Sequence, residues 1–184
     1  MKLVIVRHAD AGDAEEFAKT GKPDALRPLS EKGRKQIEDA AIGLRALVPK
    51  CDLLVTSPYT RAVQTARMVE VVYDAALEQT STLEPETAPD DFVQWLREHG
   101  DHNVVMAFGH EPHVGELSTW LMTGATESRV EFKKGGACLF EFDGAVKKGA
   151  GVLRWLMGPK ELAAVGKESR GATPPRSSRK RTTR

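Results

Sequence analysis

The feature that most constrains the fold is a short apolar, β-branched run that recurs three times along the chain. The runs lie at residues 3–6, 53–56 and 103–108. They lack the polar alternation of a half-exposed strand, as expected for strands buried on both faces of a parallel sheet. Parallel strands are joined by crossover connections that are usually helical, so these runs predict an α/β fold.

Between these runs, apolar residues recur at helical spacing. Ser30 is a good N-cap, and the apolar pattern that follows it stops at Pro49. Three more helices are predicted: one after the turn at residues 57–58, one from Pro89 to about residue 100, and one that ends at Gly124. Residues 9–29 are predicted to form a long loop, and residues 79–83 a short strand.

The last part of the domain changes period. Residues 137–142 and 152–156 are predicted to form two strands around a turn at residues 143–144, which is typical of a hairpin at a sheet edge. We therefore predict a three-layer α/β/α sandwich with a mostly parallel sheet and an antiparallel edge hairpin. A chain of 184 residues is long enough to bury the core of one such domain.

The charge divides the chain in two. Residues 159–184 contain eight Lys/Arg and two Glu, a net charge of +6, which leaves −5 for the rest of a chain whose total is +1. We predict a domain over residues 1–158 and a basic, disordered tail over residues 159–184. An acidic partner is one role for that tail. We expect no nucleic-acid partner, because the tail has no aromatic residues for base stacking.

No apolar segment approaches the roughly 20 residues of a membrane helix, and the apolar N-terminal run is too short for a signal peptide. We therefore expect a cytoplasmic protein with no membrane partner.

A cation or an imidazole follows each of the three apolar runs. Arg7 and His8 follow the first, Arg61 lies just after the second, and His110 follows the third. The carboxyl ends of parallel strands share one edge of the sheet, and open α/β sheets bind ligands at that edge. We therefore expect these side chains to form one cationic site.

Such a site suits phosphoryl transfer. The guanidinium groups of Arg7 and Arg61 match the oxygens of a phosphate, and Arg27 in the long loop offers a third fork. A neutral imidazole can attack phosphorus, so His8 is the predicted nucleophile. The surrounding arginines should lower its pKa and keep it neutral. His110 is the predicted second imidazole, which would donate to a phosphate oxygen.

These motifs resemble those of the histidine phosphatase superfamily, which includes the phosphoglycerate mutases. The resemblance is greatest to the short branch of SixA-type phosphohistidine phosphatases. It is carried by Val-Ile-Val-Arg-His at residues 4–8, Arg-Pro-Leu-Ser-Glu-Lys-Gly at 27–33, Ser-Pro-Tyr-Thr-Arg-Ala-Val-Gln-Thr-Ala at 57–66 and Gly-His-Glu-Pro at 109–112.

The resemblance implies that His8 becomes phosphorylated, and that Arg7, Arg61 and His110 form the phosphate pocket with Arg27 beside them. It also implies neither a metal ion nor an organic cofactor. Larger relatives carry a glutamate that protonates the leaving oxygen. Two glutamates occupy the corresponding stretch here, with Glu86 the first choice for this acid and Glu84 the second.

A metal site is the competing interpretation of His110, Glu111 and His113. Pro112 interrupts that stretch and no further cluster of ligands follows, so we predict no metal. For His113 itself, a place at the pocket mouth and a place on the surface remain open.

Three functions are compatible with these residues. The leading hypothesis is a metal-independent phosphatase that acts on phosphohistidine in proteins, because the chain is short and has no large insertion over the site. The alternatives are a phosphomonoesterase for a small phosphorylated metabolite, such as a sugar phosphate or nucleotide, and a non-catalytic phosphate-binding adaptor. A mutase is disfavoured, because little sequence is available for a lid that excludes water.

Overall fold

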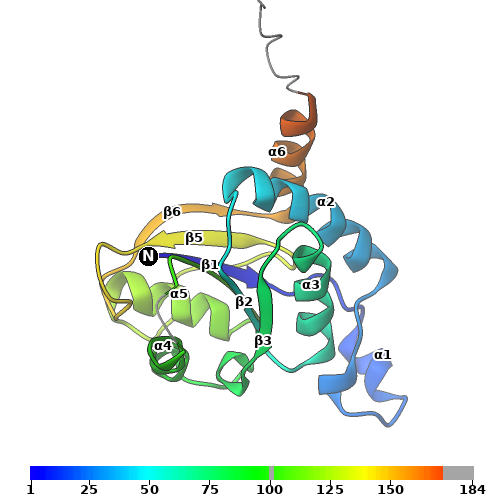
Figure 1. Cartoon of the computed structure of the whole chain (residues 1–184). Coiled ribbons are helices and arrows are strands. Elements are labelled where there is room, and N and C mark those ends of the chain that lie inside the picture. The colour runs from blue at the N-terminus through cyan, green and yellow to red at the C-terminus, as the bar shows by residue number, and fades with distance from the viewer. Residues whose placement is uncertain (100–101, 172–184) are drawn as a thin grey trace, which may run out of the picture.

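The computed structural model describes residues 1–99 and 102–171, which form a six-stranded sheet in the order β3-β2-β4-β1-β5-β6 (Figure 1). Neighbouring strands among β1, β2, β3 and β4 run parallel, whereas β5 is antiparallel to both β1 and β6. The strands are β1 (Lys2–Arg7), β2 (Leu53–Thr56), β3 (Ala76–Gln79), β4 (Val104–Gly109), β5 (Ala137–Glu141) and β6 (Val152–Met157).

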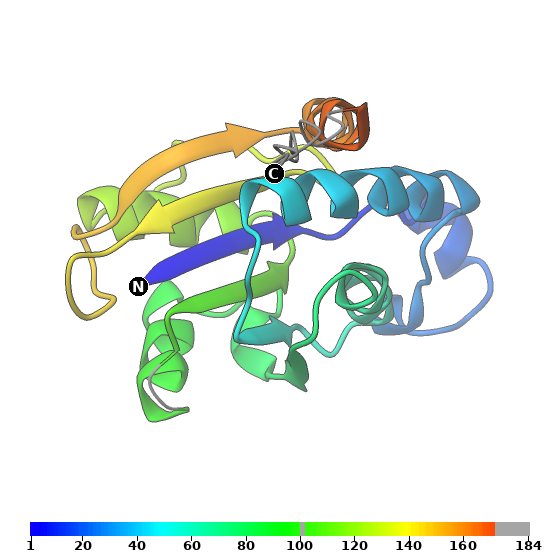
Figure 2. The same cartoon turned by 45° about the horizontal axis from the view of Figure 1, so that its top comes forward.

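Helices cover both faces of this sheet, which confirms the predicted three-layer sandwich with its antiparallel edge hairpin (Figures 1 and 2). One face carries α2 (Glu31–Leu47), α3 (Thr60–Glu70) and α6 (Pro159–Gly171), and the other carries α4 (Pro89–Glu98) and α5 (His113–Thr123). Within the described ranges, no helix has both the length and the apolar character needed to cross a membrane.

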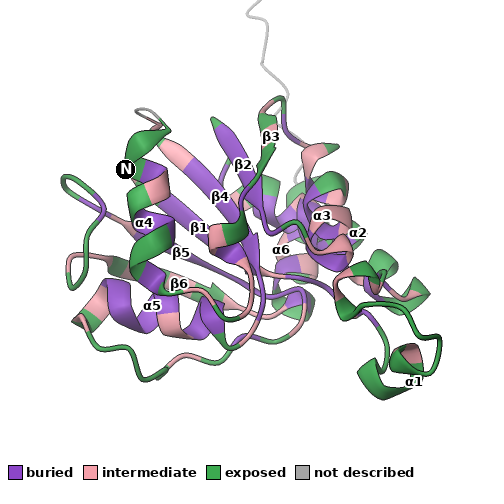
Figure 3. Cartoon of the chain, turned by 90° about the horizontal axis from the view of Figure 1, so that it is seen from below, coloured by how far each residue is buried: buried purple, intermediate pink, exposed green. Residues whose placement is uncertain are grey.

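The central strand β1 shows why the apolar runs have no alternation. Val4 and Val6 pack into the core under α2 and α3, whereas Leu3 and Ile5 pack into the core under α4 and α5. All four side chains are fully buried, and the buried colour follows the inner strands in Figure 3. Burial on both faces makes every position apolar, as the sequence pattern predicted.

Two local predictions need correction. The predicted strand at residues 79–83 shares only Gln79 with β3, and the 3-10 helix η2 (Ser81–Leu83) follows. The Thr80 side chain accepts a hydrogen bond from the Thr82 backbone N–H, and this cap turns the chain out of the sheet. The long loop at 9–29 also contains helix α1 (Ala14–Ala18), which Asp13 caps, and the 3-10 helix η1 (Asp24–Leu26).

The predicted boundary after residue 158 is wrong, because residues 159–171 form helix α6, which packs against α2. Leu162 is fully buried in the core that α2 covers. The two helices approach closely at Gly43 and Gly166: a Cβ added to Gly43 would lie 1.8 Å from the Leu162 carbonyl oxygen. The boundary at residue 158 was predicted from net charge, which did not reveal the helix that continues the domain to residue 171. The rest of the predicted tail, residues 172–184, lies outside the described residues.

Candidate active site

The three predicted motifs meet at the carboxyl edge of the sheet. Strand register places Arg7 beside Gly109, and the backbone N–H of His8 donates to the Gly109 carbonyl at 2.9 Å. In the same way, the Ser57 N–H donates to the Phe108 carbonyl at 3.0 Å. Because the three parallel strands end level with one another, the residues that follow them face one another across this edge.

His8 is held in a single tautomer. Its Nδ1 lies 2.7 Å from the carbonyl oxygen of Ala9, which can only accept, so Nδ1 carries the proton. The Nε–H of Arg61 donates to His8 Nε2 at 3.2 Å, so Nε2 carries a lone pair. The lone pair that a nucleophilic imidazole needs therefore points toward a guanidinium group, where an anion would bind.

The environment keeps this imidazole uncharged. Burial lowers the pKa of His8 to about 3; the Ala9 carbonyl opposes this shift, whereas the positive charges of Arg61, Arg7 and Arg27 add to it. Burial likewise lowers the pKa of His110 to about 2, and His8 and Arg61 contribute to that shift. Both imidazoles are therefore neutral at pH 7, as the sequence analysis predicted for His8.

Arg61 lies at the centre of the site and is only 4% exposed. Its Nη1 donates to a carboxylate oxygen of Asp24 and to the Asp24 carbonyl, both at 3.0 Å, and its Cζ lies 5.0 Å from the Tyr59 ring centroid. Arg27 Nε donates to the other carboxylate oxygen of Asp24 at 2.7 Å. The Asp24 carboxylate therefore bridges the two guanidinium groups.

The Asp24 carboxylate is an anion placed between two cations. Burial opposes its ionisation, but the hydrogen bond from Arg27 and the charges of Arg61 and Arg27 hold its pKa below the ordinary value. Sequence analysis assigned Asp24 no role. The sequence does contain a pattern that could have indicated the pair: Asp24 and Arg27 are three residues apart, which is one turn of the 3-10 helix η1.

His110 completes the group. Its ring centroid lies 5.0 Å from that of His8, and its Nε2 lies 2.9 Å from Ser57 Oγ. Its buried Nδ1 has no hydrogen-bond partner among the described residues. Ser57 belongs to a motif quoted above, but no role was assigned to it, because only the fold brings it against His110.

Arg7 occupies the same edge and bonds to the neighbouring loop. Its Nη1 donates to the Phe132 carbonyl at 2.5 Å, and its buried Nε has no partner among the described residues. Burial lowers the pKa of Arg7, although the nearby Glu111 carboxylate acts in the opposite direction. A guanidinium at this position adds to the positive potential around His8, as its effect on the His8 pKa indicates.

The two candidate acids lie in the loop after η2. This loop borders the site, because the Leu83 carbonyl oxygen would lie 3.4 Å from a Cβ added to Gly109. Glu84 is half-buried and Glu86 is exposed. Thr87 Oγ1 closes the loop by donating to the Glu84 carbonyl at 2.9 Å. Neither carboxylate has a side-chain hydrogen bond or ion pair within the described ranges, so the choice between them stays a prediction.

His113 is fully buried, so of its two possible places the surface one is wrong. Both ring nitrogens lack a hydrogen-bond partner among the described residues, and burial lowers the pKa of the ring to about 4. Glu111 accepts instead from the backbone N–H of Phe132 at 2.8 Å. In the described part of the chain, no three His, Cys, Asp or Glu side chains are grouped so that they could hold a metal ion.

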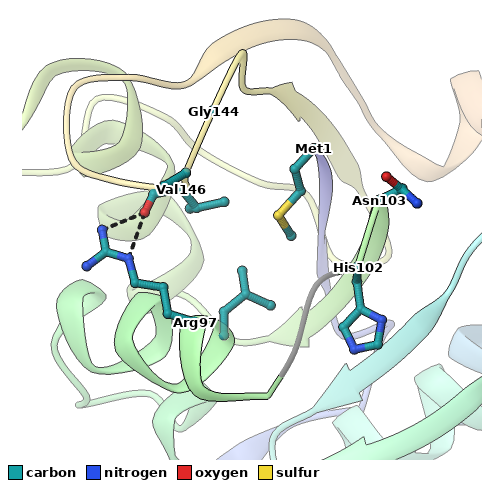
Figure 4. Close-up of a pocket in the computed structure, with 8 residues that line it drawn as sticks. Met1, Arg97, His102, Asn103, Gly144 and Val146 are labelled. Atoms are coloured by element: carbon teal, nitrogen blue, oxygen red, sulfur yellow. Dashed lines mark hydrogen bonds between the residues drawn. The ribbon is translucent and has the colours of Figure 1, made fainter.

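The described residues also enclose a cavity of about 420 Å³ at the opposite, amino edge of the sheet (Figure 4). Its most conspicuous polar side chain, Arg97, donates through Nε and Nη2 to the Val146 carbonyl at 3.1 and 2.6 Å. The Met1 ammonium donates to the Phe142 carbonyl at 2.9 Å. Both cations are therefore bound to backbone carbonyls and stabilise the chain ends and turns at this edge. A large cavity volume does not by itself identify the reactive site.

Comparison with known proteins supports the assignment from the site. The profile of the histidine phosphatase superfamily (branch 1) matches residues 3–87. An uncharacterized protein of Picosynechococcus sp. is 30% identical over 139 residues, which cover 74% of this chain and 82% of that protein. The chain belongs to the histidine phosphatase superfamily.

Solved structures agree with this assignment. The protein histidine phosphatase SixA, in complex with tungstate, is 26% identical with a TM-score of 0.74, and the match covers 88% of this chain and 99% of SixA. The α-ribazole phosphatase of Shigella flexneri shares the fold at 16% identity and a TM-score of 0.68, over 86% of this chain and 97% of that chain. This histidine phosphatase is therefore a hydrolase of phosphorylated substrates and is similar to SixA.

Proposed function

We propose that this histidine phosphatase hydrolyses phosphohistidine in proteins, with His8 as the nucleophile. The observation that carries the proposal is the fixed tautomer of His8, whose unprotonated Nε2 lies 3.2 Å from the Arg61 Nε. An uncharged imidazole beside guanidinium groups can attack a phosphoryl group that those groups bind. The similarity to SixA, a protein histidine phosphatase, supports the choice of substrate.

The proposed reaction has two steps. In the first, the His8 Nε2 lone pair forms a bond to phosphorus as the bond between phosphorus and the substrate imidazole breaks, and the electron pair leaves with that imidazole. In the second, water attacks the phosphorylated His8, its hydrogens leave with the phosphate as H2PO4⁻, and Nε2 regains its lone pair. Arg7, Arg61 and Arg27 stabilise the negative charge on the phosphoryl oxygens, and His110 donates to one of them.

The surroundings of the two candidate acids favour this substrate. An alkoxide leaving group needs a proton from an acid, whereas a phosphoimidazole protonated on its other nitrogen departs as neutral imidazole. Glu86 is exposed, and neither Glu84 nor Glu86 bonds to another side chain in the described ranges. A substrate that leaves without a strong acid suits this arrangement. If an acid does contribute, Glu86 is the first candidate and Glu84 the second.

The test is release of phosphate from a histidine-phosphorylated protein, with mass spectrometry of the enzyme after an acid-free quench. We expect a phosphorylated peptide that contains His8, and no phosphate release by His8→Ala. His99→Ala is the matched control, because His99 is exposed and lies outside the site. Turnover by His8→Ala would exclude His8 as the nucleophile, and trapped phospho-His8 would exclude a non-catalytic adaptor.

A substrate panel separates the proposal from a phosphomonoesterase of small metabolites. We expect kcat/KM for the histidine-phosphorylated protein to exceed the values for sugar phosphates and nucleotides. A metabolite turned over far faster than the phosphoprotein would favour the alternative. In that case, Glu86→Gln and Glu84→Gln should lower kcat, because an alkoxide needs the acid that imidazole does not.

A further inference from the structure

A groove lined by lysines lies beside the proposed phosphate site. Its volume is about 360 Å³. The charged residues around it are Lys32, Lys133, Lys134, Lys160, Asp10 and Glu161. Four positive and two negative charges give this groove a net positive charge, in a domain body whose sequence is otherwise mildly acidic.

The topology places the groove at the same edge of the sheet as His8. Strand β5 is antiparallel to β1, so residues 133–134, which precede β5, lie where β1 ends. Strand β6 ends at that edge too, and α6 begins there with Lys160 in its first turn. The Gly135 N–H donates to the carbonyls of Arg7 at 3.2 Å and His8 at 3.0 Å. The wall of the groove and the backbone of the nucleophile are therefore bonded to each other.

The separation from the reacting atom is short. Asp10 lines the groove and follows His8 by two residues, so about 7 Å of chain at most joins their Cα atoms. The groove therefore begins within two residues of the proposed nucleophile. This proximity is what one substrate protein would need to contact the phosphate site and the groove together.

Three of the four lysines form no ion pair with another described residue. Lys134 Nζ donates to Asp10 at 3.1 Å, so its charge is neutralised locally. Within residues 1–99 and 102–171, Lys32, Lys133 and Lys160 form no ion pair, and all three are exposed. Their charges are available to a bound molecule.

Helix stability does not explain two of these lysines. Lys32 is the second residue of α2, and Lys160 is the second residue of α6. The N-terminal end of a helix carries partial positive charge, so a cation there is unfavourable. An anion bound in the groove would reverse the sign of that interaction.

The type of cation indicates the type of ligand. The guanidinium groups at His8 are fixed and buried, as recognition of one phosphate requires. Lysines are point charges on flexible stems, and they suit negative charge that is spread over a surface. We propose that this groove docks an acidic surface of the phosphoprotein next to its phosphohistidine. This inference rests on the proposed function and adds a specificity-determining surface to it.

The test compares two synthetic peptides that carry one phosphohistidine, flanked either by glutamates or by glutamines. For the wild type at low ionic strength, we expect kcat/KM to be roughly tenfold higher with the glutamate peptide. The ratio should fall toward one as salt is raised to about 0.5 M, because salt screens exposed charges. The double variant Lys133→Gln/Lys160→Gln should lower the ratio to near one even at low salt.

The matched control is Lys147→Gln/Lys148→Gln, which removes the same charge from exposed lysines in the β5–β6 turn at the opposite edge. It should keep the wild-type ratio. Thermal unfolding of both double variants checks that they are folded. Equal kcat/KM for the two peptides in the wild type, or an unchanged ratio in Lys133→Gln/Lys160→Gln, would overturn the docking groove and leave the proposed function standing.

Failure of the proposed function gives a different result: the wild type would hydrolyse neither peptide. The groove is then judged by inhibition of p-nitrophenyl phosphate hydrolysis by the unphosphorylated glutamate peptide. We expect Lys133→Gln/Lys160→Gln to weaken that inhibition roughly tenfold. The same inhibition constant in the wild type and the double variant would overturn the inference.

Discussion

Each edge of the sheet carries an arginine that donates several hydrogen bonds, yet the two arginines differ in burial and in what they bind: Arg61 at the carboxyl edge is buried, whereas Arg97 at the amino edge is exposed. At the amino edge, Arg97 donates two hydrogen bonds to the Val146 carbonyl, and the Asp52 carboxylate accepts from the backbone N–H groups of Asn103 and Val104, where β4 begins. At the carboxyl edge, Arg61 donates to a neutral imidazole and to the Asp24 carboxylate. Arg97 thus stabilises the backbone, whereas Arg61 contacts side chains that can take part in a reaction.

This difference teaches that the direction of the strands selects the site. At the carboxyl edge, the loops after β1, β2 and β4 each supply a side chain with lone pairs or charge. At the amino edge, the same strands begin, and the polar groups there satisfy the chain ends and turns. The cavity at the amino edge, of about 420 Å³, is larger than the lysine-lined groove at the carboxyl edge, of about 360 Å³. The reactive site is therefore identified by the side chains that line it and not by cavity volume.

The largest expected effect on activity comes from replacing one arginine at each edge with glutamine, in separate variants. Arg61→Gln should lower kcat/KM roughly 100-fold or more, because it removes a donor and a positive charge beside the proposed nucleophile. Arg97→Gln should leave kcat/KM near the wild-type value and lower the free energy of unfolding by about 1 kcal/mol, because the Val146 carbonyl loses its donors. Steady-state kinetics and urea unfolding measure both.

The opposite pattern, with activity lost in Arg97→Gln and kept in Arg61→Gln, would move the reactive site to the amino edge.

The next effect concerns pH, because the carboxyl edge buries its histidines in the neutral form. For a histidine whose folded pKa is lowered, the unfolded state binds the proton more readily. Stability is therefore complete above the unfolded pKa of about 6.5 and is lost as pH falls toward the folded pKa. His113, with a pKa of about 4, should cost about 2 kcal/mol of stability at pH 5.

The measurement is urea unfolding of the wild type and His113→Leu at pH 7.5, 6 and 5. Leucine removes both the titration and two buried nitrogens that have no hydrogen-bond partner among the described residues, so the variant should be more stable at every pH. Its advantage should grow by about 2 kcal/mol from pH 7.5 to pH 5. A constant difference across this range would mean that His113 does not titrate on unfolding.

The smallest expected effect concerns the Asp24 carboxylate, an anion of the protein itself at the carboxyl edge. Asp24 bridges Arg61 and Arg27, and a bound oxyanion would compete with its carboxylate for the same guanidinium groups. Asp24→Asn should therefore lower the inhibition constant of tungstate several-fold, because a partly exposed ion pair contributes about 0.5–1 kcal/mol. Inhibition of p-nitrophenyl phosphate hydrolysis gives this constant.

Glu127→Gln is the matched control, because Glu127 pairs with Arg129 on the surface. Weaker tungstate inhibition in Asp24→Asn would show that Asp24 serves to hold the two arginines in position.

Prediction from sequence succeeded where a signal is local. The apolar runs at β1, β2 and β4 and the helical periods between them specified the layers, and strand direction then placed His8 and His110 at one edge. It was weaker at β3, where Thr80 turns the chain, and at α6, whose short apolar segment around Leu162 lies in a strongly charged region. The helix became recognisable only through its close approach to α2 at Gly43.

Sequence alone determined the order of the strands along the chain, the edge at which the charged motifs gather, and the residue types present there, because hydrophobic periodicity and strand direction are read over a few neighbouring residues. Tertiary structure alone decided the hydrogen bond from Arg61 to His8 Nε2, the bridge that Asp24 makes to Arg61, and the partner of His110. Each depends on groups that are distant in the chain: 53 residues separate His8 from Arg61, and 37 separate Asp24 from Arg61. Packing selects such contacts, so no local pattern encodes them.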